Sequence, residues 1–507
     1  MSKKSLLAVI GVVALLNILS RFFGFFREAV IGYQFGTSDK ADSIILAYTI
    51  PMFLYTVLGG AITTAFISIY KKMTKEDEKR QFQEVLFTYT CIGMVFLSLL
   101  LVVFAGPIVQ VLFPGLSAKT EKTTVYLFRW MAPSSLFLVL SMWLTGILNI
   151  YNRFFMPACS TLANNAGFVV LVLILYPFLG IDAYNIGALA GAIVMCILLA
   201  IEIKKYNIMT FRFRLSMKEG TYVQRFFRMM IPILLGGATL QFYFLIQRMF
   251  ASDLSEGVIA ALNYASKLVQ LPQVVLMTAV TTVIYPKLAG EASKGNSEGV
   301  NLMYEKGLKA LLLCIGGATV FVYVYAHEII EAVFQYGSFT EDSTMLTATL
   351  LKWFVIGMFA HGANVYVTRF FYALERPFFP VVSGVIAVFV INVSLIYLFM
   401  ESMGASGVAL ATTISAFVQF IALIIVGKGK LGLSIRSSLL SGSIWIFLLL
   451  LTVVTVLIGW GLPIENSIGR LIIGGILFVI TVLLAGAVTK IPEISSFFNK
   501  MKRKVIK

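Results

Sequence analysis

Two arginines and a glutamate stand inside an apolar stretch near the start of the chain. Arg21, Arg27 and Glu28 occur in SRFFGFFREAVIGYQFG (residues 20–36), directly after the apolar run LLAVIGVVALLNIL. At about 100° per residue, the two arginines lie about 60° to either side of Gly24 and Glu28 lies at about 40°, so the four share one helical face. A guanidinium at mid-membrane costs roughly 2.5–3.5 kcal/mol. We therefore expect this face to line a protein interior or a watery cavity, with Glu28 as an internal counter-ion.

A cavity lined by arginines is suited to an anionic ligand. Guanidinium groups bind phosphate oxygens in a bidentate manner, and a lysine adds a compact point charge. Lys267, in NYASKLVQLPQ, is expected two to three turns inside its own span and is the third member of this cationic cluster. The phenylalanines around the arginines would suit an apolar part of the ligand, so the pattern predicts an amphiphile that carries phosphate.

Four further charged residues are weaker candidates. Asp42 opens the second span and would either support the cavity or serve as the partner of one arginine. Arg129, Arg248 and Arg369 lie near span ends, where they would either line the cavity or extend to lipid headgroups.

The elements that position these residues are membrane helices. Of the 507 residues, 59% are hydrophobic and 13% are charged, whereas soluble domains have about 25% charged residues. The chain lacks nucleotide-binding loops, hydrolase triads and zinc motifs, so no enzyme is indicated. The four cysteines lie in apolar runs, and we interpret them as small buried side chains. We expect an all-α polytopic membrane protein.

Charged and Gly/Pro-rich breaks divide the chain into about fourteen transmembrane helices. The predicted spans are 5–33, 43–70, 82–113, 123–151, 155–178, 185–205, 225–250, 257–285, 302–326, 344–373, 378–400, 404–427, 436–460 and 467–489. The basic loops alternate with loops that are poor in Lys and Arg, which predicts that both termini are cytoplasmic. Much of the net charge of +16 is therefore topological and does not indicate a nucleic-acid partner.

An internal repeat divides the predicted helices into two sets. AITTAFISIY at 61–70 resembles AVTTVIYPKL at 279–288, and Pro157 and Gly187 match Pro377 and Gly407 at an offset of 220. We expect two pseudo-symmetric six-helix lobes, with substrate bound between them. The expected domains are an N-lobe (1–205), a basic cytoplasmic inter-lobe loop (206–224), a C-lobe (225–427), and two C-terminal helices with a basic cytoplasmic tail (428–507).

The same residues carry a resemblance to a known family. SRFFGFFREAVIGYQFG, ADSIILAYTIP, NYASKLVQLPQVVLMTAVTTVIYPKL, VFQYGSFTEDST and FFYALERPFFPVVSGVIAVFVINVSLIYLF resemble the MurJ (MviN) lipid II flippases of the MOP exporter superfamily. The resemblance implies two lobes that open alternately to either side and a C-terminal helix pair that holds a polyprenyl tail. By position, Arg21, Arg27 and Asp42 match charged residues of the family, and Lys267 falls where an arginine is common.

The resemblance also has departures. Many members carry an arginine pair after the span-two proline, whereas this chain has PMFLYTVLGG, with Tyr55 and Thr56 near those positions. Some members use sodium, for which Asn392 and Thr413 would supply oxygens, although spans eleven and twelve have no internal acid. We expect no other cofactor, and either sodium or the membrane potential as the energy source.

The predicted function is transport of an undecaprenyl-pyrophosphate-linked peptidoglycan precursor, lipid II, across the bacterial cytoplasmic membrane. The first alternative is a flippase for another lipid-linked oligosaccharide, such as a capsule repeat unit. A MATE-type drug/cation antiporter would need acidic cavity residues, and a scaffold for cell-wall assembly would not need arginines on an inward face. The expected partners are the lipid-linked glycan, the membrane and cell-wall synthesis proteins.

Overall fold

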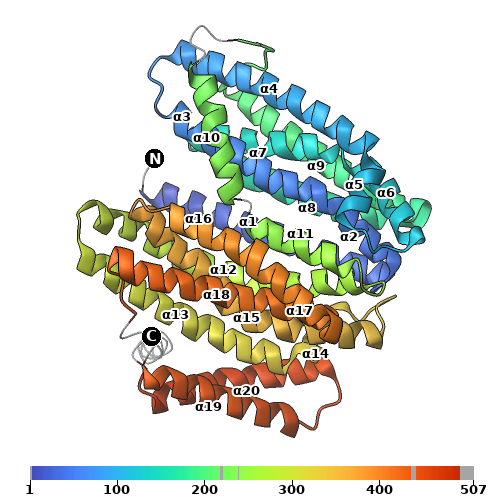
Figure 1. Cartoon of the computed structure of the whole chain (residues 1–507), viewed down its shortest axis with the longest axis vertical. Coiled ribbons are helices and arrows are strands. Elements are labelled where there is room, and N and C mark those ends of the chain that lie inside the picture. Colours follow the sequence, from blue (N-terminus) through green and yellow to red (C-terminus); the bar gives the residue numbers. More distant parts are fainter. Residues whose placement is uncertain (1–2, 217–220, 238, 436–440, 492–507) are drawn as a thin grey trace. The chain divides into compact units, whose positions relative to one another are not determined.

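The computed structural model describes residues 3–216, 221–237, 239–435 and 441–491, and all regular elements in these ranges are helices (Figure 1). The basic tail at 492–507 and part of the inter-lobe loop, 217–220, lie outside the described residues. The chain forms two compact units, 1–260 and 261–507.

The first unit contains the helices up to α11 and the start of α12. They are α1 (Lys3–Phe35), α2 (Asp39–Leu54), the π-helix η1 (Tyr55–Gly59), α3 (Gly60–Tyr70), α4 (Glu76–Val103), α5 (Ala105–Leu112), α6 (Ala118–Met131), α7 (Ser134–Ile150), α8 (Phe155–Leu179), α9 (Asp182–Lys205), α10 (Thr221–Gly237), α11 (Thr239–Ala251) and α12 (Val258–Ser293).

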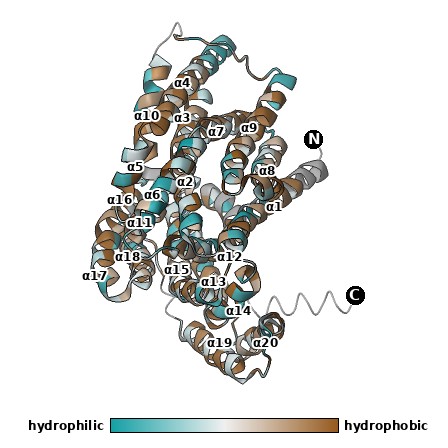
Figure 2. Ribbon diagram, turned by 90° about the vertical axis from the view of Figure 1, so that its right-hand side faces the viewer, coloured by the Kyte–Doolittle hydropathy of each residue, from teal (hydrophilic) through white to brown (hydrophobic). Residues whose placement is uncertain are grey.

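The second unit contains most of α12 and the helices that follow it. They are α13 (Ser297–Val324), α14 (Ala326–Phe334), α15 (Glu341–Ala373), α16 (Phe378–Val385), the π-helix η2 (Ile386–Asn392), α17 (Val393–Met403), α18 (Ala405–Leu431), α19 (Gly442–Gly461) and α20 (Ser467–Val488). The last two lie side by side (Figure 1), and hydrophobic residues predominate along them (Figure 2). Many of their large apolar side chains are exposed.

Many of these helices are long enough to cross a membrane. Within the described residues, ten helices are long and apolar enough to cross a membrane, or eleven if α6 and α7 form one span with a bend of 46°. The bend falls at Pro133, which cannot donate a backbone hydrogen bond. The chain is therefore an all-helical, multi-pass membrane protein.

Several predicted spans are interrupted where the sequence pattern shows continuous apolar residues. Within the expected span 82–113, α4 ends at Val103 and α5 begins at Ala105. Within the expected span 302–326, Tyr325 separates α13 from α14. Phe104 and Tyr325 have nearly the same backbone angles, φ −95° and ψ 21° against φ −100° and ψ 25°. These two breaks are 221 residues apart, close to the offset of the sequence repeat.

Two other turns recur at a similar offset. Asn152 and Glu375 both have positive φ, 57° and 56°, directly after the ends of α7 and α15. Gly180 and Gly404 share φ 55° and ψ −130° between α8 and α9 and between α17 and α18. The internal repeat is thus visible in the backbone of both units.

The first part of the predicted inter-lobe loop is bound to α4. Glu84, which is buried, accepts hydrogen bonds from the Thr210 hydroxyl and from Arg214 Nε, the latter at 2.9 Å. The Arg214 backbone N–H donates to the Thr88 hydroxyl at 2.8 Å, and the Tyr89 hydroxyl donates to the Leu215 carbonyl at 2.7 Å. A buried carboxylate needs such partners, and here they fix residues 210–215 along the helix.

The core of the first unit explains why α10 belongs to it. Phe66 packs against Phe82 and Trp143, and Phe226 of α10 contacts Phe82 edge-on at 6.3 Å between ring centroids. All four side chains are almost fully buried. Because aromatic pairs add to the burial of apolar area, this contact holds the start of α10 against α3 and α4.

Candidate functional site

The charged stretch of α1 packs against α8 through small and polar groups. The Asn165 amide donates to both the carbonyl and the hydroxyl of Ser20, each at 3.0 Å. A Cβ added at Gly24 would lie 3.6 Å from the same amide, so the glycine faces α8 at ordinary contact distance. Gly24 therefore faces a neighbouring helix, not open space.

Arg27 and Glu28 form an ion pair within this packing. The Arg27 Nη2–Glu28 Oε1 distance is 2.8 Å, and the two side chains are 14% and 3% exposed. The Arg27 guanidinium also lies 4.9 Å from the ring centroid of Tyr48 and 5.3 Å from that of Phe168. A cation is stabilised by aromatic faces at these distances. Glu28 is the counter-ion of Arg27, and α2 and α8 supply the ring faces.

Arg248 of α11 approaches the same pair from another direction. Its Nη1 donates to the Thr49 hydroxyl at 3.0 Å, and it interacts electrostatically with both Glu28 and Arg27. Thr49 follows Tyr48 on α2, so α2 contacts both arginines. The structure thus directs Arg248 into the first unit and not toward lipid headgroups.

Arg21 differs from the other two arginines. Its side chain is exposed, and it makes no hydrogen bond or ion pair with any residue that the structure describes. It lies about two turns before Arg27 on α1. Three arginines therefore accompany one glutamate, which leaves a surplus of positive charge near this part of α1.

Asp42 has a different role from the one expected as an arginine partner. Its carboxylate is 2% exposed and accepts the backbone N–H groups of Gly257 and Ala260 at 2.6 and 2.7 Å. These are the N-cap and third residue of α12, where backbone donors lack helical partners. A Cβ at Gly257 would lie 2.3 Å from the Thr37 carbonyl oxygen, so the close approach requires glycine. Of the two alternatives expected for Asp42, the arginine partner is therefore not found among the residues that the structure describes.

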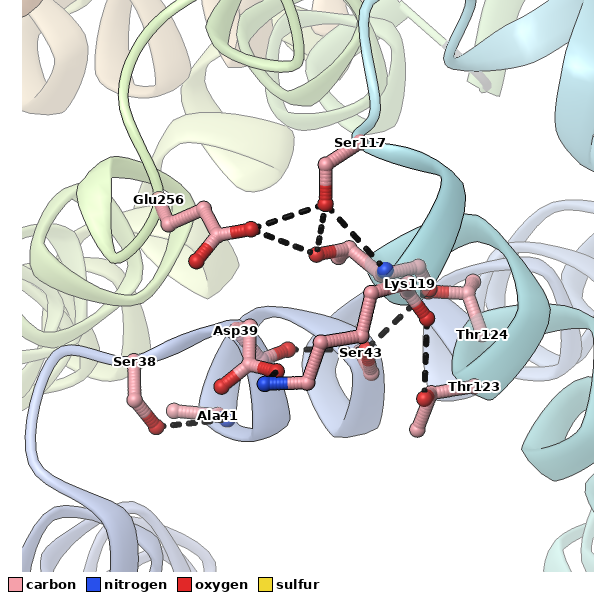
Figure 3. Close-up of polar contacts among 10 residues, drawn as sticks. Ser38, Asp39, Ala41, Ser43, Ser117, Lys119, Thr123, Thr124 and Glu256 are labelled. Carbon is pink, nitrogen blue, oxygen red and sulfur yellow. Dashed lines mark hydrogen bonds and ion pairs between the residues drawn. The ribbon is translucent and has the colours of Figure 1, made fainter.

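Residues that precede this cap in the sequence take part in a network of polar side chains with the start of α6 (Figure 3). The Ser117 hydroxyl donates to Glu256 at 2.8 Å, and the Thr120 hydroxyl does so at 3.2 Å. Lys119 pairs with Asp39 at 2.7 Å. The network ties the turn between α11 and α12 to the starts of α2 and α6, which explains why the first compact unit extends to residue 260.

The remaining cationic candidates lie apart from the α1 arginines or in the other unit. Lys267 is half-buried on α12, and Arg369 is half-buried on α15; both belong to the second unit. Their position opposite Arg21 and Arg27 stays a prediction. Arg129 is exposed on α6 and lines a pocket with no residue of α1.

Asn392 and Thr413, the expected sodium ligands, belong to η2 and α18, which pack against each other. Neither amide atom of the fully buried Asn392, at the end of η2, has a hydrogen-bond partner. The Thr413 hydroxyl donates to the Trp353 carbonyl of α15 at 2.8 Å, whereas Ser415 faces η2 and donates to the Ala387 carbonyl at 2.6 Å. The Thr413 hydroxyl is therefore directed toward α15, and its use as a sodium ligand together with Asn392 stays a prediction.

The departure from the family pattern coincides with irregular backbone. Tyr55 and Thr56, which stand near the positions of the missing arginine pair, begin the π-helix η1. Single-turn π-helices are rare in proteins, and those that occur are often found at functional sites. Nothing in the apolar pattern of residues 43–70 indicates this irregularity.

Sequence reasoning did not identify the neutral part of the site. Tyr48, Thr49, Asn165 and Phe168 contact Arg27, Arg248 or the helix that carries Arg27. The available signal was weak: polar or aromatic side chains inside the apolar spans 43–70 and 155–178. Such residues are common in membrane helices, and only the fold shows which of them meet the arginines.

Comparisons with known proteins identify the family and agree with the fold. The family model for the lipid II flippase MurJ matches residues 31–468. The chain is 26% identical over 427 residues to a probable lipid II flippase MurJ of Buchnera aphidicola subsp. Acyrthosiphon pisum, covering 81% of each chain. It is 27% identical over 440 residues to that of Treponema pallidum, covering 82% of this chain and 81% of the relative.

Solved structures with the same fold include flippases and drug transporters. A structure described as lipid II flippase MurJ in an inward closed conformation matches with a TM-score of 0.83 and 24% identity, over 98% of this chain and 99% of that one. An inward-facing MATE multidrug transporter of the MOP superfamily matches with a TM-score of 0.70 and 13% identity, over 81% and 94%. The fold is that of the MOP transporters, and the family match covers most of the sequence: the chain belongs to the lipid II flippase MurJ family.

Proposed function

We propose that this chain is a flippase that moves lipid II, the undecaprenyl-pyrophosphate-linked peptidoglycan precursor, across the bacterial cytoplasmic membrane. The observation that carries the proposal is the excess of arginine over carboxylate around α1. Arg27 and Arg248 share Glu28, while Arg21 has no partner among the described residues. A pyrophosphate offers the negative charge that this cluster lacks, and guanidinium groups bind it by paired hydrogen bonds. The activity is transport and not catalysis.

The proposed architecture of the protein consists of two six-helix lobes and a C-terminal pair of helices, α19 and α20. The ten apolar helices, the bent pair α6–α7, and the spans expected around α1, α10–α11 and α12 together make fourteen. The recurring helix breaks support two related halves. In this model Lys267 approaches the pyrophosphate from the lobe opposite Arg21 and Arg27, and the ligand draws the lobes together in an alternating-access cycle.

The proposed topology places both termini and the loops 71–80 and 206–224 in the cytoplasm, and Ser252–Gly257 and Thr340–Thr344 outside. Its support is the concentration of Lys and Arg in alternate loops. Labelling of single-cysteine variants in intact cells tests it. Reaction of a membrane-impermeant reagent at position 215 would contradict the model, whereas reaction at position 254 is expected.

The membrane potential is the proposed influence on the cycle. Each elementary charge that crosses the field contributes about 2.3 kcal/mol per 100 mV, and outward movement of an anionic headgroup is favoured when the inside is negative. Transport should therefore change when an ionophore collapses the potential at constant ATP. Unchanged transport would oppose this coupling. Sodium, with Asn392 and Thr413 as the expected ligands, stays the alternative energy source.

The cavity residues are tested by complementation in a strain depleted of its own flippase. Arg21→Ala and Lys267→Ala should each abolish or strongly reduce growth and lipid II transport, with membrane levels checked by blotting. Lys267→Arg should be tolerated, and Arg369→Ala should have a smaller effect. Normal growth and transport of both alanine variants would overturn the cavity. Accumulation of a capsule-type intermediate instead of lipid II on depletion would favour the alternative cargo.

The cell-wall synthesis machinery is the proposed partner of the transported product, since the enzymes that polymerise peptidoglycan use lipid II on the outer side. This part of the proposal depends on the cargo and not on a surface of the protein.

A further inference from the structure

A second cationic site lies between α5 and α6, away from the α1 arginines. These short helices lie side by side (Figure 1) and form a pocket of about 440 Å³. Its lining consists of Gly106, Ala118, Glu121, Lys122, Val125, Tyr126 and Arg129. None of these residues belongs to α1, α2 or α11, so the pocket is separate from the proposed pyrophosphate site.

The charge of this pocket is unbalanced. Lys122 and Arg129 stand seven residues apart on α6, two turns along the same face, and neither makes a hydrogen bond or ion pair with the described part of the chain. Glu121 accepts a hydrogen bond from the Gln110 amide at 2.7 Å, so this carboxylate already has a partner. The lining residues therefore carry two cations and one occupied carboxylate, and a further carboxylate beside Tyr126, that of Asp182, is occupied by Tyr126 and by the Asn185 amide.

The surroundings of Arg129 are those of a membrane interface. Tyr126 and Trp130 flank it on α6 and are 45% and 58% exposed. Tyrosine and tryptophan concentrate at the level of lipid headgroups. Helical side chains tilt toward the N-terminus of their helix, which favours a direction of the Arg129 guanidinium toward Tyr126 and Lys122, and all three residues line the pocket.

We propose that the α5–α6 pocket binds the phosphate of an anionic phospholipid, such as phosphatidylglycerol. Arg129 engages the phosphodiester, Lys122 adds attraction farther from the hydrocarbon, and the exposed aromatic rings contact the glycerol and upper acyl region. In the proposed topology this lipid belongs to the outer leaflet. Arg129 is thereby assigned to a lipid site at the edge of the first unit and not to the cargo cavity.

The test uses the purified full-length protein in mixed micelles, with brominated lipids that quench nearby tryptophan fluorescence. Brominated phosphatidylglycerol should quench Trp130 more strongly than brominated phosphatidylcholine, and Trp130→Phe identifies its share of the signal. Arg129→Gln and Lys122→Gln should each lower the apparent affinity for phosphatidylglycerol by about two- to fivefold, the range typical of an exposed ion pair. The matched control is Lys72→Gln, an exposed lysine outside this pocket.

Four results decide the proposal. Loss of the phosphatidylglycerol preference in Arg129→Gln, with normal quenching by phosphatidylcholine, supports it. An unchanged preference in the Arg129→Gln/Lys122→Gln double variant overturns it. Equal quenching by brominated phosphatidylethanolamine would overturn the selectivity for an anionic lipid. Competition by millimolar inorganic phosphate would overturn the lipid assignment and indicate a site for a free anion.

Discussion

The two copies of the internal repeat share their helix breaks but differ in where they carry charge. Arg27 of α1 and Arg248 of α11 are 221 residues apart, the same separation as the breaks at Phe104 and Tyr325. Glu28 follows Arg27, whereas Met249 follows Arg248, and among the interactions described for these residues Glu28 is the carboxylate that both arginines share. The repeat supplies the helical scaffold, and the departure from it produces a surplus of positive charge.

The two π-helices also differ between the copies of the repeat. The first copy contains the π-helix η1 within its second predicted span, and the second copy contains η2 within its fifth. The corresponding helices α12 and α8 are described as continuous α-helices. Each copy therefore has its own irregular helix, at non-equivalent places, close to residues that the sequence singled out: Tyr55 and Thr56 in η1 and Asn392 in η2.

The largest effect is expected from removing the shared carboxylate. Glu28→Gln keeps the size of the side chain but leaves Arg27 and Arg248 without their anion, and breaking a buried pair costs about 3 kcal/mol. We expect a marked fall in the thermal unfolding temperature in detergent, with partial recovery on addition of lipid II. Glu76→Gln, at a surface pair with Lys79, is the control and should change stability by less than about 1 kcal/mol. Equal stability of Glu28→Gln and wild type would show that the Arg27–Glu28 pair does not stabilise the fold.

The second effect separates the two equivalent arginines. Arg27→Ala removes a charge-assisted bond and two cation–π contacts, and we expect lipid II binding to weaken about 10- to 100-fold, corresponding to roughly 1.5–3 kcal/mol. Arg248→Ala removes the bond to the Thr49 hydroxyl and the attraction of Arg248 to Glu28, but it leaves the Arg27–Glu28 pair intact, so we expect a smaller loss of binding. Binding of labelled lipid II to both purified variants measures the difference. A larger loss in Arg248→Ala would reverse the order of importance.

The third effect concerns the helix cap that joins α2 to α12. Asp42→Ala leaves the N–H groups of Gly257 and Ala260 without their acceptor, and loss of such a cap costs about 1–2 kcal/mol. Asp42→Asn retains one carbonyl acceptor and should lose about half as much. Thermal unfolding of the three proteins checks the order. A greater loss in Asp42→Asn than in Asp42→Ala would contradict the capping role.

Much of the scaffold could be predicted from sequence, because membrane helices leave strong apolar patterns. The charged face of α1 and its internal counter-ion also follow from helical spacing. The partners of Asp42 could not be predicted, since backbone N–H groups more than 200 residues away have no sequence signal. Arg248 was ambiguous because a position near a span end does not distinguish an interior contact from extension to lipid headgroups.

One of the two helix breaks could be predicted from the sequence, and the other could not. Pro107 stands just after the break at Phe104 and could have indicated it, because proline removes the hydrogen bond to the preceding turn. No proline follows Tyr325 in YAHEII, so the second break has no local signal. It could have been inferred only by transferring the first break through the repeat offset.

The smallest effect compares the two equivalent turns after α7 and α15. Asn152 and Glu375 are both exposed and have φ of 57° and 56°. Asparagine tolerates positive φ better than glutamate, and glycine adopts it without steric cost. Glu375→Gly should therefore stabilise the protein by up to about 1 kcal/mol, whereas Asn152→Gly should be nearly neutral. Thermal unfolding of both variants measures this, with Glu375→Asn expected between wild type and Glu375→Gly. If Asn152→Gly stabilises more than Glu375→Gly, the two turns do not bear backbone strain in proportion to their residue types, and their equivalence is limited to the path of the chain.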